Sequence, residues 1–407
     1  MVLSPLSVAG PLGYPEAPMT NNTARDPWLL TPGPLTTAES TKQAMLHDWG
    51  SRDSAFIEMT ARVRRRLVEI AGGGDLVAVP LQGSGTFAVE AALGTFVPRA
   101  GKLLILVNGA YGARMVRMCQ IIGRACTALE TPEDVPTSPA AVDAALAADP
   151  AITHVAAVYC ETTSGIVNPI AAIADVVAAR GRRLLIDAMS AFGALPLDMG
   201  RVPCDAVMAS SNKCLEGVPG IGFVVARPEA LRACEGNAHS LSLDLHDQWR
   251  YMERTGQWRF TPPTHVLAAF DHAIERFAAE GGTAGRGGRY ARNCRVLVDG
   301  LRELGFVTLL PDHLQAPIIV TVRTPGDPRF DFEVFYQALQ QRGYVIYPGK
   351  LTVADSFRVG CIGSLGEAEM RGALAAMRAA LEEMGVEQRG PKSASVDGPA
   401  LAARPSR

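Results

Sequence analysis

The chain has 407 residues, of which 48% are hydrophobic, and this is enough apolar material for a large core and two domains. A net charge of -2 provides no basic field, so nothing favours a nucleic-acid-binding protein. The eight cysteines form no CxxC pair and no histidines have ligand-like spacing, which argues against a disulfide scaffold or a metal site. Without a membrane-length apolar stretch or a signal-peptide pattern, we expect a cytoplasmic protein that binds no membrane.

Both ends of the chain are rich in Pro, Gly and Ser, and this composition predicts a loosely ordered extension over residues 1–25 and a disordered tail over residues 387–407. Between them, predicted strands alternate with predicted helices. The predicted strands cover 76–80, 103–107, 154–159, 183–187, 206–209 and 222–226, and the predicted helices cover 87–96, 113–122, 139–148 and 169–179. This alternation predicts an α/β fold with a mostly parallel sheet flanked by helices.

The pattern changes after His265. Two long helical patterns, to about residue 280 and over 286–304, precede a mixed strand and helix region that ends in a predicted helix over 367–384. We therefore expect a large domain over residues 26–270, including the N-terminal segment, and a smaller C-terminal α/β domain over residues 271–386.

The segment GSGT, residues 83–86, follows the first predicted strand and opens the first predicted helix. Glycines allow close backbone approach, and the amides at a helix start, with the hydroxyls of Ser84 and Thr86, can bind an anion. The segment is neither a Walker loop nor a dinucleotide fingerprint, so a phosphate monoester fits best. An ordinary helix cap is the alternative.

Two further segments follow neighbouring strands. Tyr111, in NGAYGAR, lies after the second strand, where its ring could stack on a ligand or simply pack. Thr162, in ETTSG, follows the third strand, where its hydroxyl could reach the same ligand or form a local turn.

A lone acid and a lone lysine follow the next two strands. Asp187 ends the strand RLLID, at the edge of a parallel sheet where ligands bind, although it could equally cap the next segment. Lys213 lies between Ser-Ser-Asn and a glycine-rich run, and poor solvation there would lower its pKa and make it a nucleophile. A solvated loop lysine is the alternative. Together these are the two protein groups that a pyridoxal phosphate site requires.

Arg358 lies between apolar residues of the predicted second domain, in FRVG. A guanidinium fork suits bidentate recognition of a carboxylate or a phosphonate. A structural arginine paired with a carboxylate between the domains is an equally good interpretation.

The chain closely resembles the 2-aminoethylphosphonate:pyruvate transaminases, a branch of the fold-type-I pyridoxal phosphate enzymes. The resemblance runs from about Asp26 to Met384 and is carried by LLTPGPLT, LQGSGTFAVEA, NGAYGARM, ETTSG, IDAMSAFG, SSNKCLEGVPG, SLSLDLHDQWRYME, WRFTPPTH, YVIYPGK and FRVG. Of these, NKCLEGVPG and SLSLDLHDQWR look specific to the phosphonate branch.

The resemblance implies a homodimer that uses pyridoxal 5'-phosphate to move an amino group from 2-aminoethylphosphonate to pyruvate. It implies that Lys213 binds the cofactor aldehyde and that Asp187 pairs with the ring nitrogen. It also implies supporting roles for eight other residues: Ser84, Gly85 and Thr86 at the phosphate, Tyr111 on the ring, Thr162 at the ring oxygen, Thr261 at the partner's cofactor phosphate, and Arg358 with Gly33 at the substrate anion.

One departure bears on specificity, because Arg52 stands where many relatives would have an aromatic residue. An alanine:glyoxylate or other small amino-acid transaminase is the alternative enzyme. A non-catalytic binding protein of the same fold would be expected to lack Lys213 or Asp187. A desulfurase-like lyase is a weaker alternative, because no cysteine lies in an evident mobile glycine-rich loop.

Overall fold

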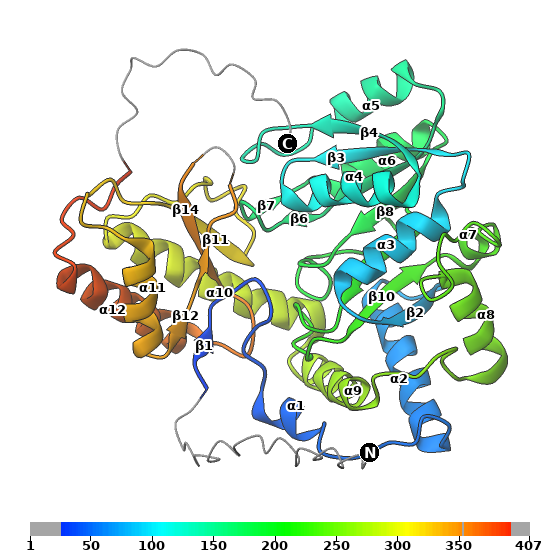
Figure 1. Ribbon diagram of the computed structural model, residues 1–407, viewed down its shortest axis with the longest axis horizontal. Coiled ribbons are helices and arrows are strands. Elements are labelled where there is room, and N and C mark those ends of the chain that lie inside the picture. Colours follow the sequence, from blue (N-terminus) through cyan, green and yellow to red (C-terminus); the bar gives the residue numbers. More distant parts are fainter. Residues whose placement is uncertain (1–25, 352–353, 392–407) are drawn as a thin grey trace, which may run out of the picture.

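The computed structural model describes residues 26–351 and 354–391. The predicted extension over residues 1–25 and most of the predicted tail lie outside the described residues. Two separate sheets organise the fold, a large one at one end of the molecule and a three-stranded one at the other (Figure 1). In the described part of the chain, no helix is both long and apolar enough to cross a membrane.

The large sheet has seven strands in the order β2-β10-β9-β8-β5-β3-β4. The strands are β2 (Val77–Gln82), β3 (Lys102–Val107), β4 (Ala125–Glu130), β5 (Ile152–Val158), β8 (Arg183–Asp187), β9 (Ala206–Ser210) and β10 (Ile221–Ala226). Only β10 runs antiparallel to its neighbours, so the predicted α/β class with a mostly parallel sheet is confirmed.

Helices cover both faces of this sheet because its central strands are apolar on both sides. In β3, Leu104 belongs to one core while its neighbours Leu103 and Ile105 belong to the core on the opposite face. The helices are α2 (Ser54–Ile70), α3 (Gly85–Phe96), α4 (Ala110–Ile122), α5 (Pro139–Ala148), α6 (Ile170–Ala179), α7 (Pro228–Arg232), α8 (Leu245–Thr255) and α9 (Thr264–Ala279).

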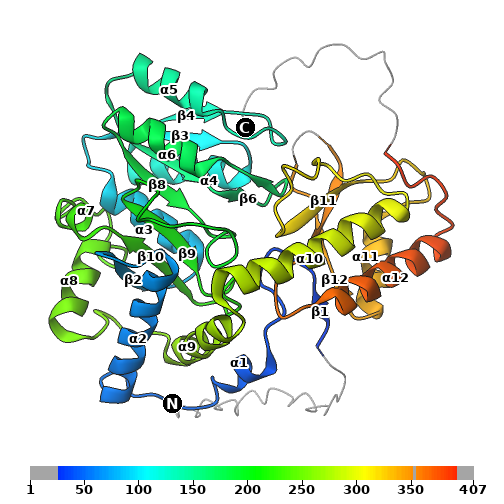
Figure 2. The same cartoon turned by 180° about the vertical axis from the view of Figure 1, so that it is seen from behind.

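A third core holds the C-terminal part together. It lies between the sheet of β11 (Ile319–Arg323), β14 (Ser356–Gly360) and β13 (Tyr347–Pro348) and the helices α10 (Gly282–Glu303), α11 (Phe332–Gln341) and α12 (Glu367–Glu383). Seen from behind, α10 runs from beside the large sheet to this second unit and so connects the two (Figure 2).

The N-terminal segment lies on the smaller unit, whereas we expected it to belong to the large domain. Strand β1 (Trp28–Leu29) pairs in parallel with β12 (Tyr344–Val345), and Leu30 is completely buried in the third core. The segment then returns through the short helix α1 (Glu39–Gln43) to the large unit, where α1 packs against α9. It therefore crosses from one unit to the other.

The division between the units also lies later than residue 270. Ile274 and Phe277 on α9 belong to the core of the large sheet, and so does Tyr290 on α10. Leu297 and Leu301, further along α10, belong to the third core. The division therefore falls within α10.

The start of the predicted tail is held against the smaller unit. The amides of Glu387 and Gln388 donate to Asp327 Oδ2 at 2.8 and 3.1 Å, and the amide of Gly326 donates to the Gly390 carbonyl at 2.7 Å. Residues 387–390 are therefore ordered, because a buried carboxylate and backbone groups bind them.

Candidate active site

Asp187 and Lys213 come together at the carboxyl edge of the large sheet. Asp187 is the last residue of β8, and Lys213 follows the end of β9, the next strand in the sheet. Parallel neighbours end at the same edge, which is where α/β folds bind ligands. Asp187 is 5% exposed, and its Oδ1 accepts a hydrogen bond of 2.9 Å from the Met189 amide.

The amine of Lys213 lies directly beneath the N-terminal segment. Its Nζ donates a hydrogen bond to the carbonyl of Pro32. Gly33 has a φ of 122°, and a Cβ at this position would lie 2.6 Å from Nζ. Only glycine combines this backbone conformation with such a close approach, so Gly33 lies beside Lys213.

Lys213 is a poorly solvated amine. Burial lowers its pKa from the ordinary value of 10.5, and the nearby Tyr111, Cys214 and Asp187 only partly offset this effect. No salt bridge involves Lys213 in the described part of the chain. A lowered pKa increases the neutral fraction of the amine, which is the form that can attack a carbonyl.

Asp187 is a buried carboxylate, and in the described part of the chain it forms no salt bridge. Burial raises its pKa from 3.8 to about 6, although the hydrogen bond from Met189 lowers it somewhat. A buried anion of this kind is costly alone and is stabilised when a cation binds beside it. The position is therefore suited to a positively charged ligand group.

Replacing Asp187 by asparagine is expected to stabilise the ligand-free protein at pH 8. The folded pKa of about 6 lies above the unfolded value, so the contribution of this carboxyl to stability is complete below pH 4 and is lost as the pH rises through 6. Asparagine avoids that loss, which is at most about 3 kcal/mol for a shift of about two units. Urea unfolding measures the difference in free energy of unfolding between the two proteins. This difference should be about half as large at pH 5 as at pH 8. A difference that does not change with pH would contradict destabilisation by the buried charge of Asp187.

The first turn of α3 offers unused donors near the same edge. Ser84 is the N-cap of this helix, but its side chain makes no capping hydrogen bond. The amides of Gly85 and Thr86 belong to the first turn, where a helix provides no acceptors for them. Gly85 packs closely against the segment after β8, because a Cβ there would lie 2.1 Å from Met189 Sδ. The residues predicted to bind an anion thus lie next to the segment that follows Asp187.

Tyr111 and Thr162 also meet at this edge, in hydrogen-bond contact with each other. Burial raises the pKa of the Tyr111 phenol, but the hydrogen bond with Thr162 and the charge of Lys213 outweigh burial, so the net shift is downward. The buried carboxylate of Glu161 orients both segments, since it accepts from the Tyr111 amide at 3.1 Å and from the Thr163 hydroxyl at 2.7 Å.

Arg358 reaches the same place from β14 of the smaller unit. It is 1% exposed, and its guanidinium donates to the carbonyl of Thr162 at 3.0 Å and to that of Pro348 at 3.1 Å. Among the described residues it forms no salt bridge, in contrast to the equally buried Arg286, which pairs with Glu280 at 2.7 Å. The alternative of a structural ion pair therefore lacks a carboxylate partner.

Thr261 and Arg52 lie apart from this cluster. Both are exposed and line an open groove with Tyr251 and Phe260. The carbonyl of Thr261 accepts a 2.9 Å hydrogen bond from Gln82, which lies just before the GSGT segment. In a single chain, Thr261 and Arg52 therefore face outward near the start of α3.

Three charged residues of the site were not singled out from the sequence. Arg114 donates to Thr86 Oγ1 at 3.4 Å, Lys350 Nζ lies 5.5 Å from the ring centroid of Tyr111, and Glu161 binds the Tyr111 segment. Each belongs to a motif that carries the family resemblance, namely NGAYGARM, YVIYPGK or ETTSG. Charge within these motifs was the signal that could have identified them.

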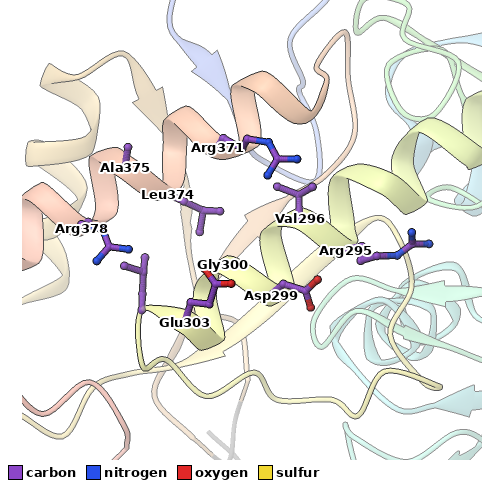
Figure 3. Close-up of a pocket in the computed structure, with 10 residues that line it drawn as sticks. Arg295, Val296, Asp299, Gly300, Glu303, Arg371, Leu374, Ala375 and Arg378 are labelled. Carbon is purple, nitrogen blue, oxygen red and sulfur yellow. The ribbon is translucent and has the colours of Figure 1, made fainter.

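A second groove, between α10 and α12, is separate from this site. Figure 3 shows that charged side chains from both helices line it, including Arg295, Asp299, Arg371 and Arg378. None of the predicted site residues lines this groove.

Comparison with known families shows what kind of site this is. The model of the family "Aminotransferase class-V" matches residues 77–358, which include Lys213, Asp187 and Arg358. The chain belongs to the class-V aminotransferase family.

Close relatives of this class-V aminotransferase have one name in common. The chain is 57% identical over 366 residues to 2-aminoethylphosphonate–pyruvate transaminase 2 of Burkholderia lata, which covers 90% of this chain and 97% of that protein. It is also 57% identical to 2-aminoethylphosphonate–pyruvate transaminase of Pseudomonas aeruginosa, with 89% of this chain and 98% of that protein covered.

Solved structures show the same fold at lower identity. Alanine–glyoxylate aminotransferase from Nostoc sp. matches with a TM-score of 0.83 at 22% identity, over 94% of this chain and 98% of that one. Pyridoxamine-pyruvate aminotransferase from Mesorhizobium loti matches with a TM-score of 0.81 at 24% identity, over 89% and 94%. The predicted fold-type-I architecture is confirmed.

Class-V aminotransferases use pyridoxal phosphate, and the described residues fit this group. The buried carboxylate of Asp187 lacks a cation, which a protonated pyridine nitrogen supplies. Lys213 is an amine with a lowered pKa, and the first turn of α3 presents free helix-start donors for a phosphate. The chain is therefore a pyridoxal phosphate-dependent aminotransferase.

Proposed function

We propose that this class-V aminotransferase transfers the amino group of 2-aminoethylphosphonate to pyruvate, which yields phosphonoacetaldehyde and L-alanine. The observation that carries the proposal is Arg358, a buried guanidinium without a carboxylate partner among the described residues, which donates to the carbonyl of Thr162. The names of relatives at 57% identity over almost their whole length support the same substrates.

The same residues divide into roles around the cofactor. Lys213 would hold the cofactor aldehyde, and Asp187 would keep its ring nitrogen protonated. Ser84, Gly85 and Thr86 would bind its phosphate, Tyr111 would stack on its ring, and Thr162 would bind its ring oxygen. The placement of these residues at one edge of the sheet supports these roles. When bound, pyridoxal phosphate supplies an electron sink for the bond that breaks.

The chain moves a proton through Lys213. A neutral Nζ can accept the proton from the carbon that bears the substrate amine and can return a proton later in the same half-reaction. Burial favours the neutral form, because it lowers the pKa of this amine.

Arg358 binds the anionic end of both substrates. The phosphonate of one and the carboxylate of the other each suit a guanidinium fork, and one arginine can serve both half-reactions in turn. The backbone near Gly33 passes over Lys213 Nζ, and this position supports its proposed part in binding the same anion.

Lys350 contributes a second positive charge at the mouth of the site. A phosphonate carries up to two negative charges and a carboxylate one, so Lys350→Ala should raise KM for 2-aminoethylphosphonate by roughly three- to tenfold and KM for pyruvate less. Steady-state kinetics at low and high salt measure this, and the difference should shrink at high salt because Lys350 is exposed. The control is Lys102→Ala, because Lys102 begins β3 and Tyr111 follows the other end of this strand. Equal effects on both substrates would contradict selectivity by charge.

The enzyme works as a homodimer in this proposal, in a cytoplasmic location. Thr261, exposed near the start of α3, would reach the cofactor phosphate of the partner subunit. The exposed Phe260, 42% accessible in the same groove, supports a covered surface here. Eight unpaired cysteines support a reducing compartment. Sedimentation of the holoenzyme tests the dimer.

A product assay tests the proposed reaction. Purified holoenzyme with 2-aminoethylphosphonate and pyruvate should form phosphonoacetaldehyde and alanine in equal amounts. Parallel assays with alanine and glyoxylate test the alternative amino-acid transaminase. Turnover of alanine and glyoxylate together with no phosphonoacetaldehyde would overturn the proposed substrate and leave the class of enzyme unchanged.

A further inference from the structure

A buried charged network lies outside the site and has no role in the chemistry so far described. It connects the turn that carries Lys213 with α10 and with the chain that leaves β14. Its members are Glu216, Glu280, Arg286, Arg289 and Tyr290.

Glu216 belongs to the turn that presents Lys213. Its amide donates to the Lys213 carbonyl at 2.8 Å, and the next amide, of Gly217, donates to the Ser211 carbonyl at 2.8 Å. Glu216 has a φ of 57°, the only positive value for a non-glycine residue in the described part of the chain. Such a conformation persists only where its surroundings hold it, and it marks functional sites.

Three side chains of α10 hold this strained turn. Glu216 Oε1 accepts from Arg289 at 2.7 Å and from the Tyr290 hydroxyl at 2.6 Å. Arg286 donates to the carbonyl of Cys214, the residue after Lys213, at 2.5 Å. The turn is therefore fixed by groups from the helix that connects the two units.

Arg289, which binds Glu216, also contacts the smaller unit. Arg289 Nη1 donates to the carbonyls of Gly363 and Leu365 at 2.5 and 2.8 Å. These residues follow directly from β14, which ends at Gly360 and carries Arg358. One guanidinium thus joins the turn of Lys213 to the chain that follows the strand of Arg358.

We propose that Glu216 and Arg289 are positioning residues that fix the separation between Lys213 and Arg358, and so match the site to the length of its anionic amine substrate. For the roles of Lys213 and Arg358 this rests on the proposed function. The substrate is held at both ends, with its amine at the Lys213 end and its anion at Arg358, so a small change in this separation misplaces the reacting carbon.

The structure supports a coupled pair in particular. Removal of Arg289 leaves the buried Glu216 carboxylate with only the Tyr290 hydroxyl at 2.6 Å and Arg286 at 3.6 Å. Removal of Glu216 leaves Arg289 paired with Glu280 at 2.7 Å but no longer joined to the turn of Lys213. Contacting residues of this kind have strongly non-additive effects, so the double variant should be little worse than either single variant.

The first test compares two amines that differ only at the anionic end. Holoenzyme without keto acid is titrated with 2-aminoethylphosphonate or with ethylamine, and the change in cofactor absorbance is followed. Glu216→Gln and Arg289→Gln should weaken the response to 2-aminoethylphosphonate about tenfold or more and change the response to ethylamine by less than about twofold. Arg289→Lys should also lose function, because an ammonium cannot reach the carboxylate and both carbonyls as a fork does.

The second test needs no cofactor. In the apoprotein, Glu216→Gln should speed amide hydrogen exchange in residues 361–365 of the smaller unit, and Arg289→Gln should speed it in residues 213–217 of the large unit. Arg292→Gln is the matched control, since Arg292 lies on α10 but pairs across to Glu367 on α12, at 3.8 Å, on the helix pair that Figure 3 shows. It should leave exchange in residues 213–217 unchanged, because its partner Glu367 lies on α12 and not on the turn of Lys213.

Equal losses with both amines would overturn the proposal, because the network would then act on Lys213 alone. Unchanged exchange in residues 361–365 of Glu216→Gln, or in residues 213–217 of Arg289→Gln, would overturn it as well. Failure of the proposed function would be seen separately, as a wild-type protein that ignores 2-aminoethylphosphonate but uses alanine. In that case, the variants are compared with alanine as the anionic amine and ethylamine as the neutral-ended one.

Discussion

Replacing Lys213 by alanine is expected to abolish both the visible absorbance of the bound cofactor and the turnover of substrate. The change removes the amine that holds the cofactor aldehyde and also the base that takes the substrate proton. General acid–base catalysis alone contributes up to about 10⁴-fold, so kcat should fall by roughly that factor. Absorbance spectra and an alanine-formation assay on the same preparation measure the two losses.

The structure provides a control for this variant. Lys102 is a partly exposed lysine at the start of β3 and forms an ion pair with Asp149 at 2.6 Å. Because the site lies at the other end of this strand, Lys102→Ala should keep both the visible absorbance and the turnover. A Lys213→Ala protein that folds normally and still shows both would exclude Lys213 as the cofactor anchor.

Replacing Arg358 by glutamine is expected to lower kcat/KM by about 100-fold or more for both substrates. Truncating one partner of a buried, hydrogen-bonded charge pair costs about 2–5 kcal/mol, and here the lost partner would be the substrate phosphonate or carboxylate. The visible cofactor absorbance should remain, because Arg358 contacts the carbonyls of Thr162 and Pro348 and lies on a different unit from Lys213.

A conservative variant separates anion binding from packing. Arg358→Lys keeps a positive charge but loses the fork, so it should recover only part of the activity. If Arg358→Gln lost activity with 2-aminoethylphosphonate and kept it with pyruvate, the arginine would not be shared between the half-reactions.

Much of the large unit could be predicted because its signals are local. The strand over 183–187 matches β8 and the helix over 139–148 matches α5, since apolar runs and helix starts are read within a few residues. The short distance between Asp187 and Lys213 followed from the rule that parallel strands end at one edge. The pair alone suggested a pyridoxal phosphate site, and the family resemblance supplied the roles of the other residues.

Other features depend on contacts between distant parts of the chain. Strand β4 was missed because it is an exposed edge strand with a weak apolar pattern. The pairing of β1 with β12, and hence the place of the N-terminal segment, joins residues more than 300 positions apart. The network of Glu216 and Arg289 has no local signal either, because each residue alone resembles an ordinary surface charge.

The absorbance of the purified holoenzyme during addition of 2-aminoethylphosphonate, without any keto acid, tests the central claim most directly. We expect the visible band of the bound cofactor to disappear as the aminated form appears in the near ultraviolet, and pyruvate to restore it. A visible band that ignores 2-aminoethylphosphonate and responds to alanine would contradict the proposed amino donor.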